Sequence, residues 1–209
     1  MKLYYNPHAC SLAVVILAAE AGIRLELAEV DILKDPHTLA DGSDFATINP
    51  KGYVPMLELD NGERLTEVAV ILQYLADLRP EADLVPPAGS IERVWQQEAL
   101  NFIATELHKF YSPWLFHPEV GETAQAYARS KIASRFAILD LQLSHYEFVA
   151  GDSFTAADAY LYVMANWSAF AKVPLAPYPN LRAWFRRIGD RPAVKEALRL
   201  HAGKQAAAV

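Results

Sequence analysis

The chain has 209 residues, of which 53% are hydrophobic, and a formal net charge of −6 at pH 7. This composition excludes a disordered chain, and the length suits one large or two small domains with a buried core. The acidic balance makes nucleic acid an unexpected partner. The single cysteine, Cys10, permits no disulfide within the chain, so the fold does not depend on an oxidising compartment.

The N-terminus loosely imitates a secretory signal peptide, because Lys2 precedes an apolar stretch at Leu12–Ala19. However, Tyr4–His8 separates the charge from that stretch, and no small-residue cleavage site stands out. No apolar run reaches the roughly 18 to 20 residues that cross a bilayer. We therefore expect a soluble, cytoplasmic protein without a membrane partner.

The first third of the chain alternates between strand and helix patterns. Asn6-Pro7 ends a short aromatic strand, Gly22 suits the end of a helix, and Asp60-Asn61-Gly62 is a strong hairpin turn signal. This order predicts an α/β domain over residues 1–79. Its predicted elements are a strand at Leu3–Tyr5, a helix at Ser11–Ala21, a strand at Leu25–Ile32, an irregular stretch from Asp35, strands at Val54–Leu59 and Arg64–Thr66, and a helix at Glu67–Leu78.

The segment 80–90 is rich in proline, lacks periodicity and is interpreted as an interdomain linker. The pattern beyond it is helical, which predicts an all-α domain over residues 91–209. Pro192 suits the first turn of the last helix, and 205–209 is expected to be a frayed tail. The predicted helices are Ile91–Trp114, Thr123–Tyr146, Thr155–Phe170, Asn180–Gly189 and Pro192–Ala202.

Cys10 lies between a proline-containing turn and the helix predicted to start at Ser11. The N–H groups and partial positive charge of a helix N-terminus stabilise an anion and lower the pKa of a thiol. Two interpretations stay open. Cys10 is either a reactive thiol, which a protonated His8 would favour, or a small residue packed beneath the turn.

Two junctions could contact a peptide-like ligand. A cis bond at Val54–Pro55 would turn the Val54 backbone toward solvent, where it could pair with an extended peptide, although a trans edge proline is the commoner arrangement. At Thr66–Glu67 a strand meets a helix whose first N–H groups can bind a carboxylate, while the Glu67 side chain can hold an ammonium group. Glu67 could equally be an acid that only favours the first helical turn.

The helix predicted at Ile91–Trp114 carries a narrow, mostly uncharged polar stripe, whereas its opposite face and flanks are apolar. A solvated face would carry more Lys and Glu, so the stripe indicates either the lining of a cleft or a plain surface stripe. Its members are Glu98, Asn101, Thr105, His108 and Ser112.

Two other patterns carry no expected chemistry. Thr155 and Asp158 have the spacing of a helix-capping pair, so we interpret Asp158 as structural even if it is buried. The six histidines lack metal-ligand spacing, and the glycines form no phosphate-binding loop. We therefore expect no metal.

Eight short motifs follow one another along nearly the whole chain. They are Lys2-Leu3-Tyr4-Tyr5, Ala9-Cys10-Ser11-Leu12, Asn49-Pro50-Lys51-Gly52, Val54-Pro55, Leu65-Thr66-Glu67, Gln73-Tyr74-Leu75-Ala76-Asp77, Thr105-Glu106-Leu107-His108-Lys109, and Phe154-Thr155 with Asp158-Ala159-Tyr160. None is decisive alone, but together they resemble the bacterial beta-class glutathione transferases. The resemblance implies the glutathione transferase fold, in which a thioredoxin-like N-terminal domain precedes an all-helical C-terminal domain.

The resemblance also implies an activity and a site. It implies a homodimeric detoxification enzyme that uses glutathione as co-substrate and conjugates its thiolate to small electrophilic or hydrophobic substrates. Thiol–disulfide or peroxidase chemistry at Cys10 is a further implied activity. The implied catalytic residues are Cys10, Ser11 and His108, and the implied glutathione ligands are Lys34, Val54, Pro55, Glu67, Val68, Asn101 and Thr105.

The chain departs from the family pattern around the expected pocket. His8 and Val68 stand where glycine or another small residue is usual, Val15 replaces a frequent histidine, and Tyr53 replaces a glutamine. These changes motivate an alternative: a non-enzymatic binding or regulatory module of the same fold, with weak or no glutathione binding.

Overall fold

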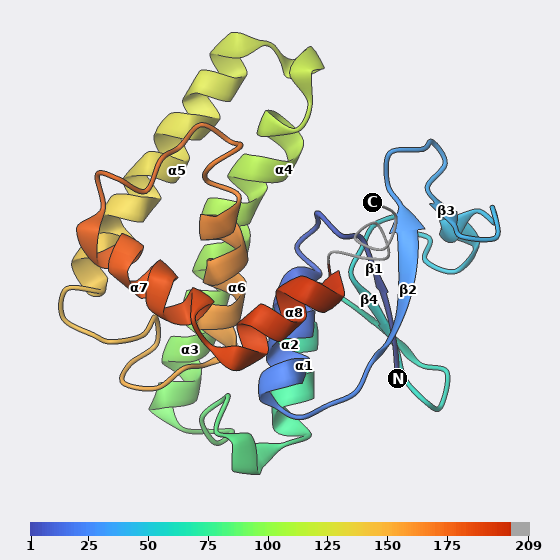
Figure 1. Ribbon diagram of the computed structural model, residues 1–209, viewed down its shortest axis with the longest axis horizontal. Helices are drawn as coiled ribbons and strands as arrows, with labels where there is room; N and C mark the ends of the chain where they lie inside the picture. The colour runs from blue at the N-terminus through green and yellow to red at the C-terminus, as the bar shows by residue number, and fades with distance from the viewer. Residues whose placement is uncertain (202–209) are drawn as a thin grey trace. The chain divides into compact units, whose positions relative to one another are not determined.

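The computed structural model describes residues 1–201, which form two compact units (Figure 1). One contains Met1–Ala82 together with the last helix, α8 (Pro192–His201), and the other contains Asp83–Arg191. The prediction of a helical domain over 91–209 is therefore wrong for α8, which belongs to the first unit. This helix buries Val194 and Ala197 and packs against α1 of the first unit. The predicted tail at 205–209 and Ala202 lie outside the described residues.

The first unit is built on a five-stranded sheet with the order β3-β2-β1-β4-β5. β1 runs parallel to β2 and antiparallel to β4, and the two outer pairs are antiparallel. β1 is paired on both edges, and its last three residues are buried. β3 lies inside the stretch predicted to be irregular. The strands are β1 (Lys2–Tyr5), β2 (Glu26–Asp31), β3 (Thr38–Leu39), β4 (Met56–Glu58) and β5 (Arg64–Thr66).

Three helices lie together on one side of this sheet: α1 (Leu12–Glu20), α2 (Val68–Asp77) and α8 (Figure 1). α1 packs against both of the others, and every side chain from Leu12 to Ala18 is buried. A further buried cluster joins the sheet to the segment before β4. It consists of Tyr4, Val30, Phe45, Val54 and Met56.

The second unit is helical, as predicted, but its first predicted helix is interrupted. Residues Ile103–His108 form a π-helical segment, η3, where Ile91–Trp114 was expected to be one continuous α-helix. The helices on either side are α3 (Ile91–Phe102) and α4 (Lys109–Leu115), and they are followed by α5 (Glu122–Gln142), α6 (Ala156–Asn166) and α7 (Pro179–Gly189). In residues 1–201 no helix is long and apolar enough to cross a membrane.

α6 is the core helix of this unit, since nearly all its residues are buried. Thr155 and Asp158 form the predicted capping box at its start. The Asp158 carboxylate accepts hydrogen bonds from the Val149 N–H (3.0 Å), the Thr155 N–H (3.0 Å) and hydroxyl (3.2 Å), and the Trp184 indole N–H (2.9 Å). Burial raises the pKa of Asp158 to about 6, while these donors act in the opposite direction. The structural interpretation of Asp158 is confirmed.

Candidate functional site

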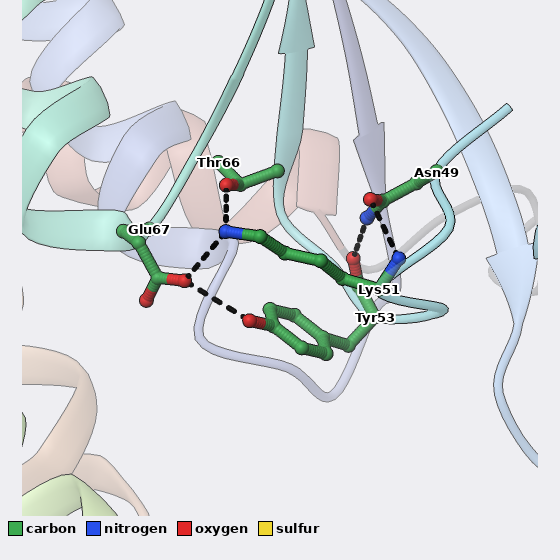
Figure 2. Close-up of polar contacts among 5 residues, drawn as sticks. All are labelled: Asn49, Lys51, Tyr53, Thr66 and Glu67. Atoms are coloured by element: carbon green, nitrogen blue, oxygen red, sulfur yellow. Dashed lines mark hydrogen bonds and ion pairs between the residues drawn. The ribbon is translucent and has the colours of Figure 1, made fainter.

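The segment 49–53 is folded by a buried asparagine. The Asn49 side chain accepts a hydrogen bond from the Lys51 N–H at 3.2 Å and donates one to the Tyr53 carbonyl at 2.8 Å. Figure 2 shows that the side chains of Lys51 and Tyr53 both extend toward Glu67. The segment thus presents a cation and a phenol at the start of α2.

Glu67 joins β5 to α2 and receives both groups (Figure 2). One carboxylate oxygen accepts from the Tyr53 hydroxyl at 3.0 Å and from the Lys51 ammonium at 3.3 Å, and Lys51 also donates to the Thr66 hydroxyl at 2.7 Å. Partial burial, followed by the contact with Glu67, raises the pKa of the Tyr53 phenol, which therefore remains a donor. The φ of Glu67 is 73°, a region that costs a residue with a side chain about 1–3 kcal/mol and is concentrated at functional sites.

The first N–H groups of α2 are available for an anion. The N–H groups of Val70 and Ile71 bond to the Glu67 carbonyl, whereas those of Val68 and Ala69 have no hydrogen-bond partner within residues 1–201. A helix start with unpaired N–H groups attracts a carboxylate. Next to the Glu67 carboxylate, these donors fit the paired ammonium and carboxylate of an α-amino acid.

Cys10 lies against the turn that contains Val54. The Val54–Pro55 bond is cis, which confirms the less common of the two alternatives. The Cys10 thiol is 6% exposed and donates to the Val54 carbonyl, with Sγ 3.8 Å from the oxygen. The Val54 N–H has no partner in the part of the chain that the structure describes. The thiol is thus packed beneath a turn that keeps one backbone donor available.

The start of α1 differs from the open helix N-terminus that the sequence suggested. The Leu12 and Ala13 N–H groups bond to the carbonyls of Ala9 and Cys10, at 3.3 and 3.0 Å. These donors are used within the turn. The Ser11 N–H, which follows Cys10 in the chain, has no partner among residues 1–201 and therefore remains available to an anion.

The Ser11 side chain lies in the core, whereas the implied role of Ser11 at the helix start beside Cys10 stays a prediction. It is fully buried, and its hydroxyl lies 3.2 Å from the Asn6 carbonyl and 3.1 Å from His201 Nε2. His201 comes from α8 and is only 2% exposed. Burial lowers the pKa of His201 to about 4, so its ring is neutral at pH 7. The Ser11–His201 contact ties α8 to the start of α1.

Lys34, an implied glutathione ligand, is not brought to this site by any interaction in residues 1–201. Its side chain is 65% exposed, and its ammonium group pairs with Asp31 at 3.3 Å. His37 occupies the neighbouring position instead, with Nδ1 2.6 Å from the Gly52 carbonyl. The basic groups held at the segment 49–53 are therefore Lys51 and His37.

In the helical unit, the stripe residues Asn101, Thr105 and His108 lie at the junction of α3 and η3. Asn101 and Thr105 are exposed, and the Thr105 hydroxyl donates to the Asn101 carbonyl at 2.9 Å. His108 is half-buried, with Nδ1 2.7 Å from the Tyr160 hydroxyl and its ring edge-to-face with Trp167. π-Helical turns occur frequently at functional sites, and here one orients a histidine. Residues 1–201 contain no group of side chains that could hold a metal ion.

Four residues of these networks were given no role at the site from the sequence: His37, Lys51, Tyr53 and His201. Lys51 and Tyr53 could have been given one, because Lys51 belongs to a family motif, Tyr53 departs from the family pattern, and both flank Gly52 directly before the Val54–Pro55 pair. His201 carries no such local signal, since its partner Ser11 lies 190 residues away in the chain.

Comparison with known proteins agrees with this arrangement. The family model for the N-terminal domain of glutathione S-transferase matches residues 9–78, and that for the C-terminal domain matches residues 102–192. Glutathione S-transferase GstA of Escherichia coli O157:H7 is 40% identical over 198 residues, which cover 95% of this chain and 97% of GstA. The chain belongs to the glutathione S-transferase family.

Solved structures show which glutathione S-transferases the chain resembles in its fold. A sphingomonad glutathione S-transferase complexed with glutathione matches with a TM-score of 0.92 and 41% identity, over 97% of this chain and 100% of that one. A bacterial beta-class glutathione S-transferase from Sphingomonas chungbukensis matches with a TM-score of 0.91 and 40% identity, over 96% and 98%. The predicted fold class and the likeness to the bacterial beta class are confirmed.

Proposed function

We propose that the protein is a glutathione transferase, which binds glutathione in its N-terminal unit and conjugates the thiolate to small electrophiles. The observation that carries this proposal is the junction of β5 and α2. The Glu67 carboxylate suits the ammonium group of the γ-glutamyl residue, and the Val68 and Ala69 N–H groups suit its carboxylate. The glutathione complex of the sphingomonad relative supports the same ligand.

The turn at Val54–Pro55 supplies the second contact. The Val54 N–H is positioned to bond the backbone of the cysteinyl residue, which would bring the glutathione sulfur to the side of the turn where Cys10 lies. The thiolate then attacks an electrophilic carbon, a C–S bond forms, and the leaving group departs with its electron pair. The proposed helical-domain contributors are Asn101, Thr105 and His108. Lys51 replaces Lys34 in the proposed set.

Cys10 offers a second reaction, in which the ligand is the oxidised form of glutathione. Its thiolate can attack one sulfur of oxidised glutathione, forming a mixed disulfide with the chain and releasing one glutathione thiolate. The test is a panel that combines conjugation of 1-chloro-2,4-dinitrobenzene with reduction of a glutathione-linked disulfide. We expect glutathione-dependent turnover in at least one assay, and silence in both would contradict the catalytic proposal.

The alternative is a binding or regulatory module without catalysis. The observation that favours it is that Lys51 and Tyr53 already engage the Glu67 carboxylate. An incoming ammonium would have to share this group. Binding of glutathione without turnover, or no binding at all, would favour the module.

We also propose a cytoplasmic homodimer that acts in detoxification, with the N-terminal unit of one chain facing the helical unit of its partner. Exposed apolar side chains support an interface. Val70 on α2 is 49% exposed, and Ile91 and Val94 on α3 are 53% and 52% exposed. A two-fold arrangement is the commonest way to bury such residues.

A further inference from the structure

Tyr160 is not among the residues proposed to act in catalysis, yet its hydroxyl contacts one that is. The hydroxyl oxygen lies 2.7 Å from Nδ1 of His108, and the two rings meet edge-to-face with their centroids 5.8 Å apart. Tyr160 is buried within α6, whereas His108 is half-buried at the end of η3. The contact therefore ties a partly accessible imidazole to the core of the helical unit.

The end of α6 holds the His108 ring at a second point. Trp167, the C-cap residue of this helix, is buried, and its ring lies 5.3 Å from the imidazole at an interplanar angle of 63°. Nearly every residue of α6 is buried, so the helix is a close-packed and rigid support. One contact on a ring nitrogen and another on the ring itself restrict the orientation of His108.

The distance between Tyr160 and His108 indicates which group donates. Hydrogen bonds to oxygen are typically about 2.7–2.8 Å long when a hydroxyl donates and about 2.9–3.0 Å long when an N–H donates. A phenol is also a stronger donor than a neutral imidazole N–H, and a bare imidazole nitrogen is a stronger acceptor than a phenol oxygen. Both arguments favour Tyr160 as the donor and a bare Nδ1 as the acceptor. A neutral imidazole carries one proton on its two nitrogens, which leaves that proton on Nε2.

We propose that Tyr160 is a positioning residue that holds His108 as the Nε2-protonated tautomer, so that the imidazole serves as a hydrogen-bond donor and not as a base. This inference rests on the proposed function for the group on which His108 acts, the sulfur of glutathione. An N–H donor beside the sulfur stabilises the thiolate relative to the thiol, which loses its proton to water. Tyr160 acts on the reaction through His108.

Nitrogen-15 NMR of the full-length protein tests the tautomer without any ligand, since protonated and bare ring nitrogens have well-separated shifts. His108→Gln identifies the His108 signals by their loss. At about pH 8, where an ordinary histidine is neutral, we expect Nε2 of His108 to be protonated and Nδ1 to be bare. In Tyr160→Phe the Nδ1 signal should move toward that of a nitrogen without a hydrogen bond.

Tyr111→Phe is the matched control. Tyr111 is also buried and its ring also meets Trp167 edge-to-face, but its hydroxyl has no hydrogen-bond partner in residues 1–201. Its replacement removes a phenol from the same aromatic cluster and should leave both His108 nitrogen shifts unchanged. A protonated Nδ1 in the unaltered protein, or equal shifts in Tyr160→Phe and the unaltered protein, would overturn the proposal.

The thiol of bound glutathione gives a second readout. Its ionisation is followed by ultraviolet absorbance, with the S-methylglutathione complex as the reference. We expect Tyr160→Phe to raise the pKa of the bound thiol by about 0.5 unit and Tyr111→Phe to leave it unchanged. His108→Gln keeps an N–H donor but cannot accept a proton, so it should raise this pKa less than half as much as His108→Ala. Equal effects of Gln and Ala would identify His108 as a base and overturn its role as a donor.

The proposed function and the role of Tyr160 fail in different ways. If the unaltered protein does not bind glutathione, the proposed function fails together with the action of His108 on the sulfur. The nitrogen shifts then still decide whether Tyr160 sets the tautomer. If glutathione binds but Tyr160→Phe changes neither readout, the proposed function stands and Tyr160 is a packing residue alone.

Discussion

Cys10 is the residue that distinguishes the two chemistries open to the site. It is the only cysteine of the chain, and its thiol donates to the Val54 carbonyl. We predict that Cys10→Ala abolishes alkylation of the native protein and formation of a glutathione mixed disulfide. Part of the conjugating activity should survive, because glutathione carries its own thiol.

Mass spectrometry after iodoacetamide treatment measures the alkylation rate of the unaltered protein against pH. A reactive thiol titrates below the ordinary pKa of about 8.5. A native rate near zero up to about pH 9, followed by fast alkylation in denaturant, would identify Cys10 as a core residue without chemistry.

Tyr53 holds the carboxylate that we assign to the γ-glutamyl ammonium group. Its hydroxyl donates to Glu67 at 3.0 Å. We predict that Tyr53→Phe raises the Kd for glutathione about five- to tenfold, or roughly 1–1.4 kcal/mol, because the Glu67 carboxylate loses a donor that positions it. Tyr74→Phe removes a phenol elsewhere in the unit and should change little. Equal Kd values for both variants and the unaltered protein would contradict the role of Tyr53.

Among individual residues, the sequence indicated those that belong to a pattern of neighbouring residues. It did not indicate contacts between residues far apart in the chain. Glu67 was found because a strand meets a helix there, and Asp158 because of its spacing from Thr155. The sequence did not reveal that the Ser11 hydroxyl faces His201 in the core. This contact joins opposite ends of the chain and therefore leaves no local pattern.

At the scale of elements, the contact between α1 and α8 carries a pH dependence. His201 has a pKa of about 4 in the folded chain, against 6.5 for an ordinary histidine. The folded state therefore binds fewer protons than the unfolded state between these values. The contribution of His201 to stability is complete above about pH 6.5 and falls as the pH falls to about 4, by up to roughly 3 kcal/mol.

Urea unfolding at pH 7 and near pH 4.5 measures this effect. His201→Gln should be less stable than the unaltered protein at pH 7 and should lose less stability on acidification. Asp158, whose raised pKa acts with the opposite sign, is present in both proteins and cancels in the comparison. The exposed His145→Gln is the control. A parallel loss of stability in His201→Gln and the unaltered protein would refute the assignment.

The elements themselves were largely predictable, with two informative failures. Periodicity located the helices and the hairpin to within a few residues. It could not reveal the π-helical segment Ile103–His108, because the buried residues on either side of and within it are spaced three or four residues apart, as in an α-helix. These residues are Leu100, Ile103, Leu107 and Tyr111. Nor could periodicity assign α8 to the first unit, because a helix's apolar face does not specify its partner.

At the scale of the whole molecule, the exposed apolar residues of α2 and α3 predict self-association. Light scattering at micromolar concentration should give twice the mass of the chain. Val94→Glu places a charge among these side chains. This variant should shift the protein toward the monomer and should still unfold cooperatively, because Val94 is exposed in the single chain. A clean monomer mass for the unaltered protein would refute the homodimer.

The central claim is that the N-terminal unit binds glutathione through Glu67 and the start of α2. Isothermal titration calorimetry with glutathione tests it most directly, using the unaltered protein and Glu67→Gln. The claim predicts one site per chain with a Kd in the micromolar to low-millimolar range, weakened at least tenfold in Glu67→Gln because the ammonium group loses its charged partner. The absence of detectable binding by the unaltered protein, or equal affinity in the two proteins, would contradict it.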